Sequence, residues 1–557
     1  MLTAHLRDDE ATDTFAMSKG NSTKADVRAL WQAAADAARQ GDTPLAMEKL
    51  RSARVLAPRN LEILLFLADL LHFSGRMEEA RSLLEEGKTI APDAPVLAFK
   101  LGQLYRAFER FDRARREFRI VLAQQPEHHP SREALVLVEV AEGDYSAAEK
   151  IADGANGVAE QSELLELISI EATARGADEV AQRCGERAFE LLPNAGTALS
   201  LARAQFHAGA DRAAKAQLNW ILEEADTDAT IRARAIGTLA DIADRDGDFE
   251  AAFEQYASSK RLLREAYERS NMNRAGSFQS LVERLTLSVG RLSPPMQEES
   301  AGAPSPAKHV FLLGFPRTGT TLLEQCLSGN RAVVTSDETD ALRQAIQPFL
   351  NHPDPFKAFE ARKQFGYQDI RAAYWRRIVQ RRPSLEDKVF IDKMPLNSVF
   401  AGFIPTLFPE AKVIFAVRDP RDVVISCFRR RFGMNSATYE FCTLEGAVSL
   451  YCAVMHLFSL SQRNTRLAPL LCRYEDVVGD LRGTVSKLCE FIGIDWQEEM
   501  ARFSERANRR PLSTVSAPQL TQDLYDGSGS WRSYGPFLAP HLHKLAPWIS
   551  HFGYKPA

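Results

Sequence analysis

Hydrophobic side chains in the first half of the chain recur at intervals of three and four residues, the spacing that places them on one face of a helix. Blocks such as GDTPLAMEKL, GRMEEARSLL, ERFDRARREF and GDYSAAEKIA each combine a turn with such an amphipathic helix, and they follow one another every 34 residues. Three sets of residues repeat at this interval: Gly41, Gly75, Glu109 and Gly143 in the turn; Ala46, Ala80, Ala114 and Ala148 in the helix; and Pro58, Pro92 and Pro126 after the second helix. Small residues permit close helix packing and proline ends a helix, so the pattern predicts stacked helix pairs.

Looser copies of the unit begin near residues 176, 209 and 247, which gives about seven units in all. The pattern resembles the tetratricopeptide repeat. This resemblance implies an all-α superhelix over residues 24–270, whose concave face binds a peptide or a protein. A purely structural or oligomerising array is the alternative, and a homodimer stays open because such surfaces also self-associate. Residues 1–23 are expected to form a flexible N-terminus.

The hydrophobic pattern changes after residue 270. Residues 271–308 end in LSPPMQEESAGAPSPAKH, a stretch rich in Pro, Ser and Gly that is typical of a linker. The apolar run HVFLLG then suits a buried strand of a parallel sheet. We therefore expect a second domain over residues 309–557, of the α/β P-loop-like class with a parallel sheet.

Composition excludes several other classes of protein. A chain of 557 residues exceeds the roughly 250 to 300 residues of a single core, and 45% hydrophobic with 26% charged residues is typical of globular proteins. The formal charge of −5 gives no sign of a nucleic-acid partner. Seven cysteines without a CxxC pair suggest neither a disulfide framework nor a zinc site. The first residues lack a signal-peptide pattern, and the most apolar segment, residues 61–73, is too short to span a membrane, so a cytoplasmic location is expected.

The strand HVFLL leads into the sequence GFPRTGTT and then an apolar helix, the order found in phosphate-binding loops. Backbone N–H groups and the helix N-terminus bind an anion in such a loop. The candidate ligands are Arg317, Thr318, Gly319, Thr320 and Thr321. A nucleoside triphosphatase carries Lys where this chain has Thr320, so the loop favours a metal-free reaction in which Arg317 supplies the charge.

A second anion-binding element begins at the strand KVIFAV. Arg418 follows this strand directly, at the edge where parallel sheets bind ligands. Ser426 and Arg430 lie four residues apart, on one face of the next helix, so both side chains can reach one phosphate. The alternative is that FRRRF is only a solvated basic run.

Both elements resemble segments of sulfotransferases, in particular the tyrosylprotein sulfotransferase branch and its bacterial relatives. PRTGTTLLEQ is similar to the 5′-phosphosulfate loop, and RDPRDVVIS to the 3′-phosphate motif. The resemblance implies 3′-phosphoadenosine 5′-phosphosulfate (PAPS) as the co-substrate and covers residues 309–557. Cytosolic small-molecule sulfotransferases carry Lys where this chain has Arg317 and use a His base, so the branch with an acidic base is favoured.

The same resemblance assigns roles to further residues. It makes Glu338 in VVTSDETD the general base, with Asp337 as a weaker competitor, and Lys393 in VFIDKMP the group that stabilises the bridging oxygen. It places Ser516 against the sulfate or bridging oxygen, Tyr474 beside the nucleotide and Arg532 at the 3′-phosphate. The expected catalytic residues are Glu338, Lys393, Arg317 and Ser516, without a metal.

The expected function is sulfuryl transfer to an acceptor hydroxyl, for which a protein tyrosine is preferred because a repeat array accompanies the domain. Sulfation of a glycan or a small molecule is the alternative acceptor. A P-loop kinase or hydrolase and a non-catalytic repeat scaffold are alternatives of another class. The missing Walker lysine argues against the kinase, and the joint presence of Glu338, Lys393, Arg418 and Ser426 argues against the scaffold.

Overall fold

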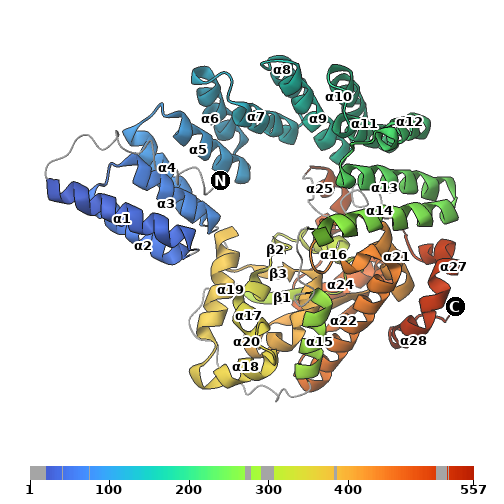
Figure 1. The fold of residues 1–557 in the computed structure, drawn as a ribbon. Helices are drawn as coiled ribbons and strands as arrows, with labels where there is room; N and C mark the ends of the chain where they lie inside the picture. Colours follow the sequence, from blue (N-terminus) through green and yellow to red (C-terminus); the bar gives the residue numbers. More distant parts are fainter. Residues whose placement is uncertain are drawn as a thin grey trace. The chain divides into compact units, whose positions relative to one another are not determined.

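The computed structural model describes residues 21–40, 42–74, 76–269, 277–289, 306–381, 385–509, 524 and 526–556. The expected flexible N-terminus therefore falls almost wholly outside the described residues. The chain divides into two compact units, one formed by residues 1–172 and 183–192 and the other by residues 173–182 and 193–557. Figure 1 labels their helices and strands.

The first unit consists of helix pairs. Its helices are α1 (Asn21–Arg39), α2 (Thr43–Leu56), α3 (Leu61–Phe73), α4 (Met77–Ile90), α5 (Pro95–Ala107), α6 (Phe111–Gln124), α7 (His129–Glu142), α8 (Tyr145–Asp153), α9 (Val158–Ala174) and α10 (Asp178–Leu191), the last two of which reach the division between the units. The alanines that repeat in the sequence, Ala46, Ala80, Ala114 and Ala148, are fully buried. Pro58, Pro92 and Pro126 each lie two residues beyond the end of α2, α4 or α6. The predicted all-α repeat array is thus confirmed.

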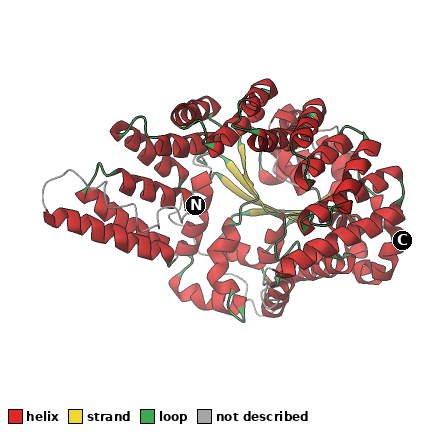
Figure 2. Ribbon diagram, turned by 45° about the horizontal axis from the view of Figure 1, so that its top comes forward, coloured by secondary structure: helices red, strands yellow, loops and turns green. Residues whose placement is uncertain are grey.

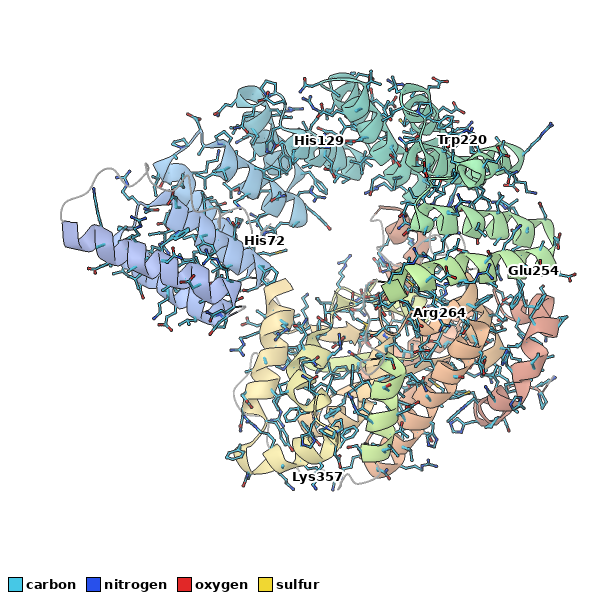
Figure 3. The ribbon with its side chains drawn as sticks, in the orientation of Figure 1. His72, His129, Trp220, Glu254, Arg264 and Lys357 are labelled. Atoms are coloured by element: carbon cyan, nitrogen blue, oxygen red, sulfur yellow. The ribbon has the colours of Figure 1, made fainter. Side chains whose placement is uncertain are left out.

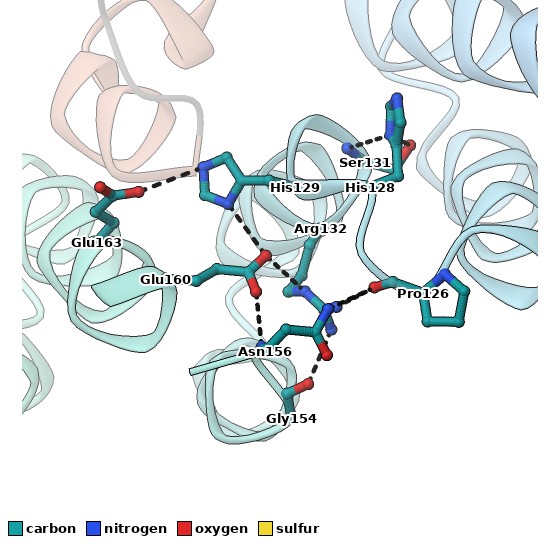
Figure 4. A network of polar contacts seen from close by, with 9 residues as sticks. All are labelled: Pro126, His128, His129, Ser131, Arg132, Gly154, Asn156, Glu160 and Glu163. Carbon is teal, nitrogen blue, oxygen red and sulfur yellow. Dashed lines mark hydrogen bonds and ion pairs between the residues drawn. The ribbon is translucent and has the colours of Figure 1, made fainter. Parts of the chain in front are cut away.

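A buried arginine holds two neighbouring turns of this array together (Figure 4). Arg132 of α7 donates from Nε to Glu160 of α9 at 2.9 Å and from Nη1 to the Gly154 carbonyl at 2.9 Å. It also donates to the carbonyl of Pro126, in the turn before α7. One guanidinium thereby satisfies carbonyls that the ends of α6 and α8 leave without helical partners.

The second unit begins with two more helix pairs, α11 (Ala195–His207) with α12 (Asp211–Glu223) and α13 (Ala229–Asp246) with α14 (Phe249–Arg269). Ala214 and Ala252, at the repeat position of the buried alanines, are also fully buried. These helices continue the repeat pattern, yet they belong to the same compact unit as the α/β domain.

The predicted linker contains a helix, α15 (Phe278–Val289). Phe278, Val282, Leu285 and Val289 are buried on it at helical spacing and join the main core of the second unit. The helix packs against α18 (Pro355–Ala361) and α22 (Leu444–Asn464). Residues 270–276 and 290–305 of the predicted linker lie outside the described residues.

The α/β domain contains one parallel sheet of five strands in the order β2-β3-β1-β4-β5. The strands are β1 (Lys308–Leu313), β2 (Val333–Asp337), β3 (Val389–Lys393), β4 (Lys412–Val417) and β5 (Leu470–Arg473). Val310 and Leu312 of β1 face one core cluster, whereas Phe311 and Leu313 face the other. The sheet is therefore covered by helices on both faces, as parallel sheets require (Figure 2). The expected fold class is confirmed.

The remaining elements connect and cover these strands. They are α16 (Thr320–Leu327), α17 (Ala341–Leu350), η3 (Arg362–Phe365), α19 (Gln368–Arg381), η4 (Pro395–Phe403), α20 (Ile404–Leu407), α21 (Pro420–Arg429), η5 (Glu440–Cys442), α23 (Tyr474–Gly479), α24 (Leu481–Ile492), η6 (Glu498–Met500), α25 (Phe503–Arg509), η7 (Ser530–Tyr534), α27 (Gly535–Leu538), η8 (Ala539–His541) and α28 (Leu542–His551).

One helix of the described chain, α22, is long and apolar enough to cross a membrane by length and composition. More than half of it is buried within the second unit. Its Phe458 stacks on Phe415 of β4 with ring centroids 3.9 Å apart. Its apolar character is therefore accounted for by its place against the sheet.

Candidate active site

The loop between β1 and α16 is packed too closely for larger residues. A Cβ atom at Gly314 would lie 2.7 Å from Oγ1 of Thr318 and 2.9 Å from the Ala416 carbonyl oxygen. Gly319 caps α16 with a φ of 94°, a conformation that favours glycine. Thr320 and Thr321 then form the first turn of α16. The loop therefore presents N–H groups and the positive end of a helix to one point, as an anion site requires.

Arg317 lies inside this loop in a left-handed conformation, with a φ of 73°. Its Nε donates to the Ser426 hydroxyl at 3.0 Å, so the two predicted anion-binding elements are in direct contact. Burial lowers the pKa of Arg317 to about 10, and the neighbouring guanidinium groups of Arg430 and Arg418 add to this effect. Clustered buried cations are stabilised by an anion placed among them.

Three of the predicted 3′-phosphate residues, Arg418, Ser426 and Arg430, lie around one small cavity of about 140 Å³. Arg418 donates to the Gly527 carbonyl at 2.6 Å, and its guanidinium lies 4.5 Å from the ring centroid of Tyr474. The Tyr474 hydroxyl accepts the Gly527 N–H at 3.3 Å. The cavity is lined by Arg317, Gly319, Thr321, Leu322, Arg418, Ser426, Arg429, Arg430, Tyr474, Phe503, Leu524, Gly527 and Ser530.

The segment GSGSWRSY reaches this cavity through residues other than the predicted one. Asp422 of α21 accepts hydrogen bonds from the Gly529 N–H at 2.7 Å, the Ser530 hydroxyl at 3.0 Å and the Trp531 N–H at 2.8 Å. This arrangement turns Arg532 onto the Trp531 ring, at 5.3 Å from its centroid, and Arg532 does not line the cavity. Ser516 lies outside the described residues.

Lys393, at the carboxyl end of β3, lies between two carboxylates. Its Nζ is 2.6 Å from Oε1 of Glu338 and 3.1 Å from Oε2 of Glu324. Burial lowers the pKa of Lys393, but the two carboxylates outweigh burial, and the pKa lies above its ordinary value. The Lys393 side chain is 1% exposed and that of Glu338 is 43% exposed, so Glu338 is the more accessible member of the pair.

Sequence reasoning missed Glu324. It lies on α16 in TTLLEQCL, one turn after the loop, and its side chain is 3% exposed. A carboxylate in such a position needs a partner, because an unpaired buried charge is costly. An acidic residue among buried apolar positions of a helix was the signal in the sequence.

A larger cavity of about 500 Å³ lies on the other side of the loop. Glu338, which has a φ of 38°, faces it together with Arg343 and Asn397. Residues 394–397 and 432–438 supply much of the remaining lining. Arg317, Gly319 and Thr321 line both cavities. An anion on the loop is thus accessible from two sides, one basic and one carrying a carboxylate.

A buried hydrogen-bond chain supports β3 beneath Lys393. The Tyr374 hydroxyl donates to Asp392 at 2.8 Å. It also lies 2.9 Å from Nε2 of His309. Because the hydroxyl proton is used for Asp392, Nε2 of His309 is the donor in this second contact. Ser336 accepts the Lys393 N–H at 3.1 Å and links β2 to β3. Burial raises the pKa of Asp392 to about 7, against the hydrogen bonds from Tyr374 and Ser336, and lowers the pKa of His309 to about 3.

Fold and site together define a chain in which helical repeats precede a parallel α/β domain with a composite anion site. The comparisons agree. Residues 309–498 match the model of the sulfotransferase family, and residues 37–101 match that of the tetratricopeptide repeat. The expected resemblance to sulfotransferases that carry tetratricopeptide repeats is confirmed.

Individual relatives are distant. The chain is 25% identical over 332 residues to an uncharacterized protein of Aquifex aeolicus (strain VF5), covering 56% of this chain and 41% of that protein. It is 24% identical over 263 residues to a protein-tyrosine sulfotransferase of Drosophila melanogaster, covering 44% of this chain and 52% of that protein. The chain thus spans about half the length of these curated relatives.

Solved structures match each part of the chain. The sulfotransferase domain from the Synechococcus PCC 7002 olefin synthase is 21% identical, covers 43% of this chain and 92% of its own, and has a TM-score of 0.30. A tetratricopeptide repeat protein from Parabacteroides merdae ATCC 43184 is 17% identical, covers 43% of this chain and 93% of its own, and has a TM-score of 0.33.

Proposed function

We propose that this protein transfers a sulfuryl group from PAPS to an acceptor hydroxyl. The observation that carries the proposal is the loop shared by two cavities, with arginines on one side and Glu338, which contacts Lys393, on the other. PAPS has anionic groups at both ends, which suits a site with one anion-binding loop and a separate basic cavity. The match of residues 309–498 to the sulfotransferase family supports the same reaction.

In the proposed reaction, the loop residues Gly319, Thr320 and Thr321 bind the phosphosulfate, and Arg418, Ser426 and Arg430 bind the 3′-phosphate. The acceptor oxygen forms a bond to sulfur while the bond from sulfur to the bridging phosphate oxygen breaks. Glu338 takes the hydroxyl proton. The products are a sulfate ester and adenosine 3′,5′-bisphosphate.

Lys393 links proton removal to the departure of the leaving group. When Glu338 accepts the proton it becomes neutral, so its attraction for the Lys393 ammonium weakens. Lys393 and Arg317 then stabilise the negative charge that develops on the bridging oxygen. We propose that these two cations replace the magnesium ion of phosphoryl transfer.

For the acceptor we propose a hydroxyl on a polypeptide, such as tyrosine. Several relatives are named protein-tyrosine sulfotransferases, and tetratricopeptide arrays commonly bind polypeptides. A third cavity of about 960 Å³ lies in the second unit and shares Phe432 and Gly433 with the 500 Å³ cavity that contains Glu338. The charged lining of this third cavity suits an acidic segment. That lining comprises Arg203, Arg234, Arg245, Arg429, Arg430, Arg431 and His207, with Asp241 and Asp244.

A small-molecule acceptor is the second candidate. A segment of 115 residues is 28% identical to a 3-alpha-hydroxysteroid sulfotransferase of Cavia porcellus, but it covers only 19% of this chain. A cytoplasmic location and a homodimer also stay predictions.

Calorimetric titration of the full chain tests the proposed co-substrate. We expect adenosine 3′,5′-bisphosphate to bind more tightly than ATP with magnesium. Arg418→Ala should weaken bisphosphate binding by about tenfold or more, because it removes a charge-assisted contact worth about 1.5–3 kcal/mol. Arg482→Ala, which changes an exposed arginine paired with Glu498, serves as the control. Preference for ATP with magnesium, or no nucleotide binding, would contradict the proposal.

A further inference from the structure

Three arginines follow one another at the end of α21, and the last repeat helices bind two of them. Arg429 forms an ion pair with Asp244 of α13. Arg431 forms an ion pair with Asp241 of the same helix, at 2.6 Å. Arg430, between them, forms no ion pair with any residue that the structure describes, and its side chain lines the cavity that also contains Arg418 and Ser426.

A lysine of α14 fixes the backbone at the same point. Lys260 is 4% exposed, and its Nζ donates to the Arg430 carbonyl at 2.6 Å. This carbonyl belongs to the residue that caps the C-terminus of α21, where a cation is favoured by the helix dipole. Burial lowers the pKa of Lys260 to about 8, so ordering this side chain has a cost that a surface lysine does not bear.

Helix α14 also packs on the domain with apolar and aromatic side chains. Phe253 stacks on Phe537 with centroids 3.9 Å apart and lies 5.1 Å from Phe428 of α21. Further along α14, the Arg264 guanidinium lies 5.0 Å from the ring centroid of Tyr439. Arg264 is labelled in Figure 3. In Figure 1, α14 lies beside α21 within the second unit, and α13 packs on α14. The last helix pair of the repeats, α13 and α14, is thus an integral part of the α/β domain.

We propose that Asp241, Asp244 and Lys260 are positioning residues for the 3′-phosphate subsite. Asp244 and Asp241 hold Arg429 and Arg431 in ion pairs, and Lys260 fixes the backbone of Arg430. Arg429 and Arg430 both line the nucleotide cavity, which is the cavity that contains Arg418 and Ser426. Arg430 is the one of these two without an ion pair among the described residues, so its guanidinium is the one left to meet the 3′-phosphate. The inference rests on the proposed function. It assigns to the last repeat helices a supporting part in nucleotide binding, in addition to any partner that the array binds.

Paired titrations of the full chain test this role. Each variant is titrated with adenosine 3′,5′-bisphosphate and with adenosine 5′-monophosphate, which lacks the 3′-phosphate. We expect Lys260→Met and the double variant Asp241→Asn with Asp244→Asn to weaken bisphosphate binding about tenfold and to leave monophosphate binding within about twofold. Lys260→Arg, which retains a donor and the charge, should restore most of the lost affinity.

Matched controls lie on α13 and on its neighbour α12. Asp246→Asn and Lys215→Met remove a surface ion pair between α12 and α13 whose atoms are 2.8 Å apart, and both should bind the two nucleotides like the unchanged chain. Equal losses for both nucleotides, or none, would overturn the positioning role. If Lys260→Met does not fold, the aspartate variant alone decides by the same criterion. If the unchanged chain does not prefer the bisphosphate, the proposed function itself fails.

Discussion

At the scale of single residues, the site depends on how charge is divided around Lys393. Glu324 is buried and Glu338 is half-exposed, so the two carboxylates have different roles although both contact the same ammonium. Glu338 is free to exchange the lysine for the acceptor hydroxyl, whereas Glu324 is fixed. In the proposed reaction, the buried carboxylate therefore keeps the lysine charged and in place while the exposed carboxylate carries the proton.

Glu324→Gln tests this division. Removing one carboxylate lowers the pKa of Lys393. As the pH is raised, we therefore expect the variant to lose activity at a lower pH than the unchanged chain does. We also expect its kcat at neutral pH to be reduced about tenfold. Glu338→Gln should instead reduce kcat by about 10²–10⁴. The measurement is release of adenosine 3′,5′-bisphosphate at saturating PAPS across pH 6–10. An unchanged kcat and pH profile for Glu324→Gln would contradict the role.

The buried Asp392 makes stability depend on pH. Its folded-state pKa of about 7 lies above the ordinary value of 3.8, so the folded chain holds a proton that the unfolded chain has released. The stabilising contribution is full below about pH 4 and is lost as pH rises through 7. Asp392→Asn keeps an acceptor for Tyr374 and does not titrate.

We therefore expect the free energy of unfolding of the unchanged chain to fall, relative to that of Asp392→Asn, between about pH 4 and pH 7. Urea unfolding at several pH values measures this difference, and the neutral His309 cancels because both chains contain it. A difference that does not vary with pH would show that Asp392 ionises normally.

Motif residues could be predicted from sequence because each lies in a loop or helix that directly follows a strand of the sheet, and the fold fixes the direction of that strand. Arg317, Arg418 and Ser426 meet around one cavity for this reason. Glu324 could not be found in the same way, because its role comes from Lys393, on a strand 69 residues away in the sequence. Arg532 faces Trp531 because Asp422 fixes the preceding loop, a contact that no local pattern indicates.

At the scale of secondary-structure elements, periodic packing made the repeats predictable. Alanine is required wherever two helices approach closely, and the buried Ala46, Ala80 and Ala114 mark that position in successive units. Helix α15 was less evident, because the Pro- and Ser-rich sequence that follows it dominates the composition of residues 271–308. Its apolar side chains Phe278, Val282, Leu285 and Val289 nevertheless follow helical spacing.

At the scale of the whole molecule, the repeat pattern of the sequence and the first compact unit of the structure do not end at the same residue. The sequence pattern continues through α14, whereas the second unit already includes α11. Sequence similarity between repeats reflects helix-to-helix packing, which is the same in every unit. The similarity between repeats therefore does not indicate which of the helix pairs also packs against the α/β domain.

Two truncations separate these boundaries. Residues 193–557 retain α13 and α14, so we expect this fragment to fold and to bind adenosine 3′,5′-bisphosphate within about threefold of the full chain. Residues 271–557 lack both helices. Removal of α13 and α14 exposes Phe428 and Phe537, which costs about 1.5–3 kcal/mol of stability for each large apolar side chain. It also leaves Arg429 and Arg431 without their aspartate partners.

We expect the shorter fragment to melt at a temperature lower by 10 °C or more, on the order of what several kcal/mol costs a domain of this size, and to lose bisphosphate binding. Thermal melts and calorimetric titration of both fragments measure the two effects. Equal binding by the two fragments would mean that the α/β domain forms its nucleotide site alone. Because the nucleotide cavity and α14 meet at Arg430, we expect the boundary of the functional domain to lie before α13.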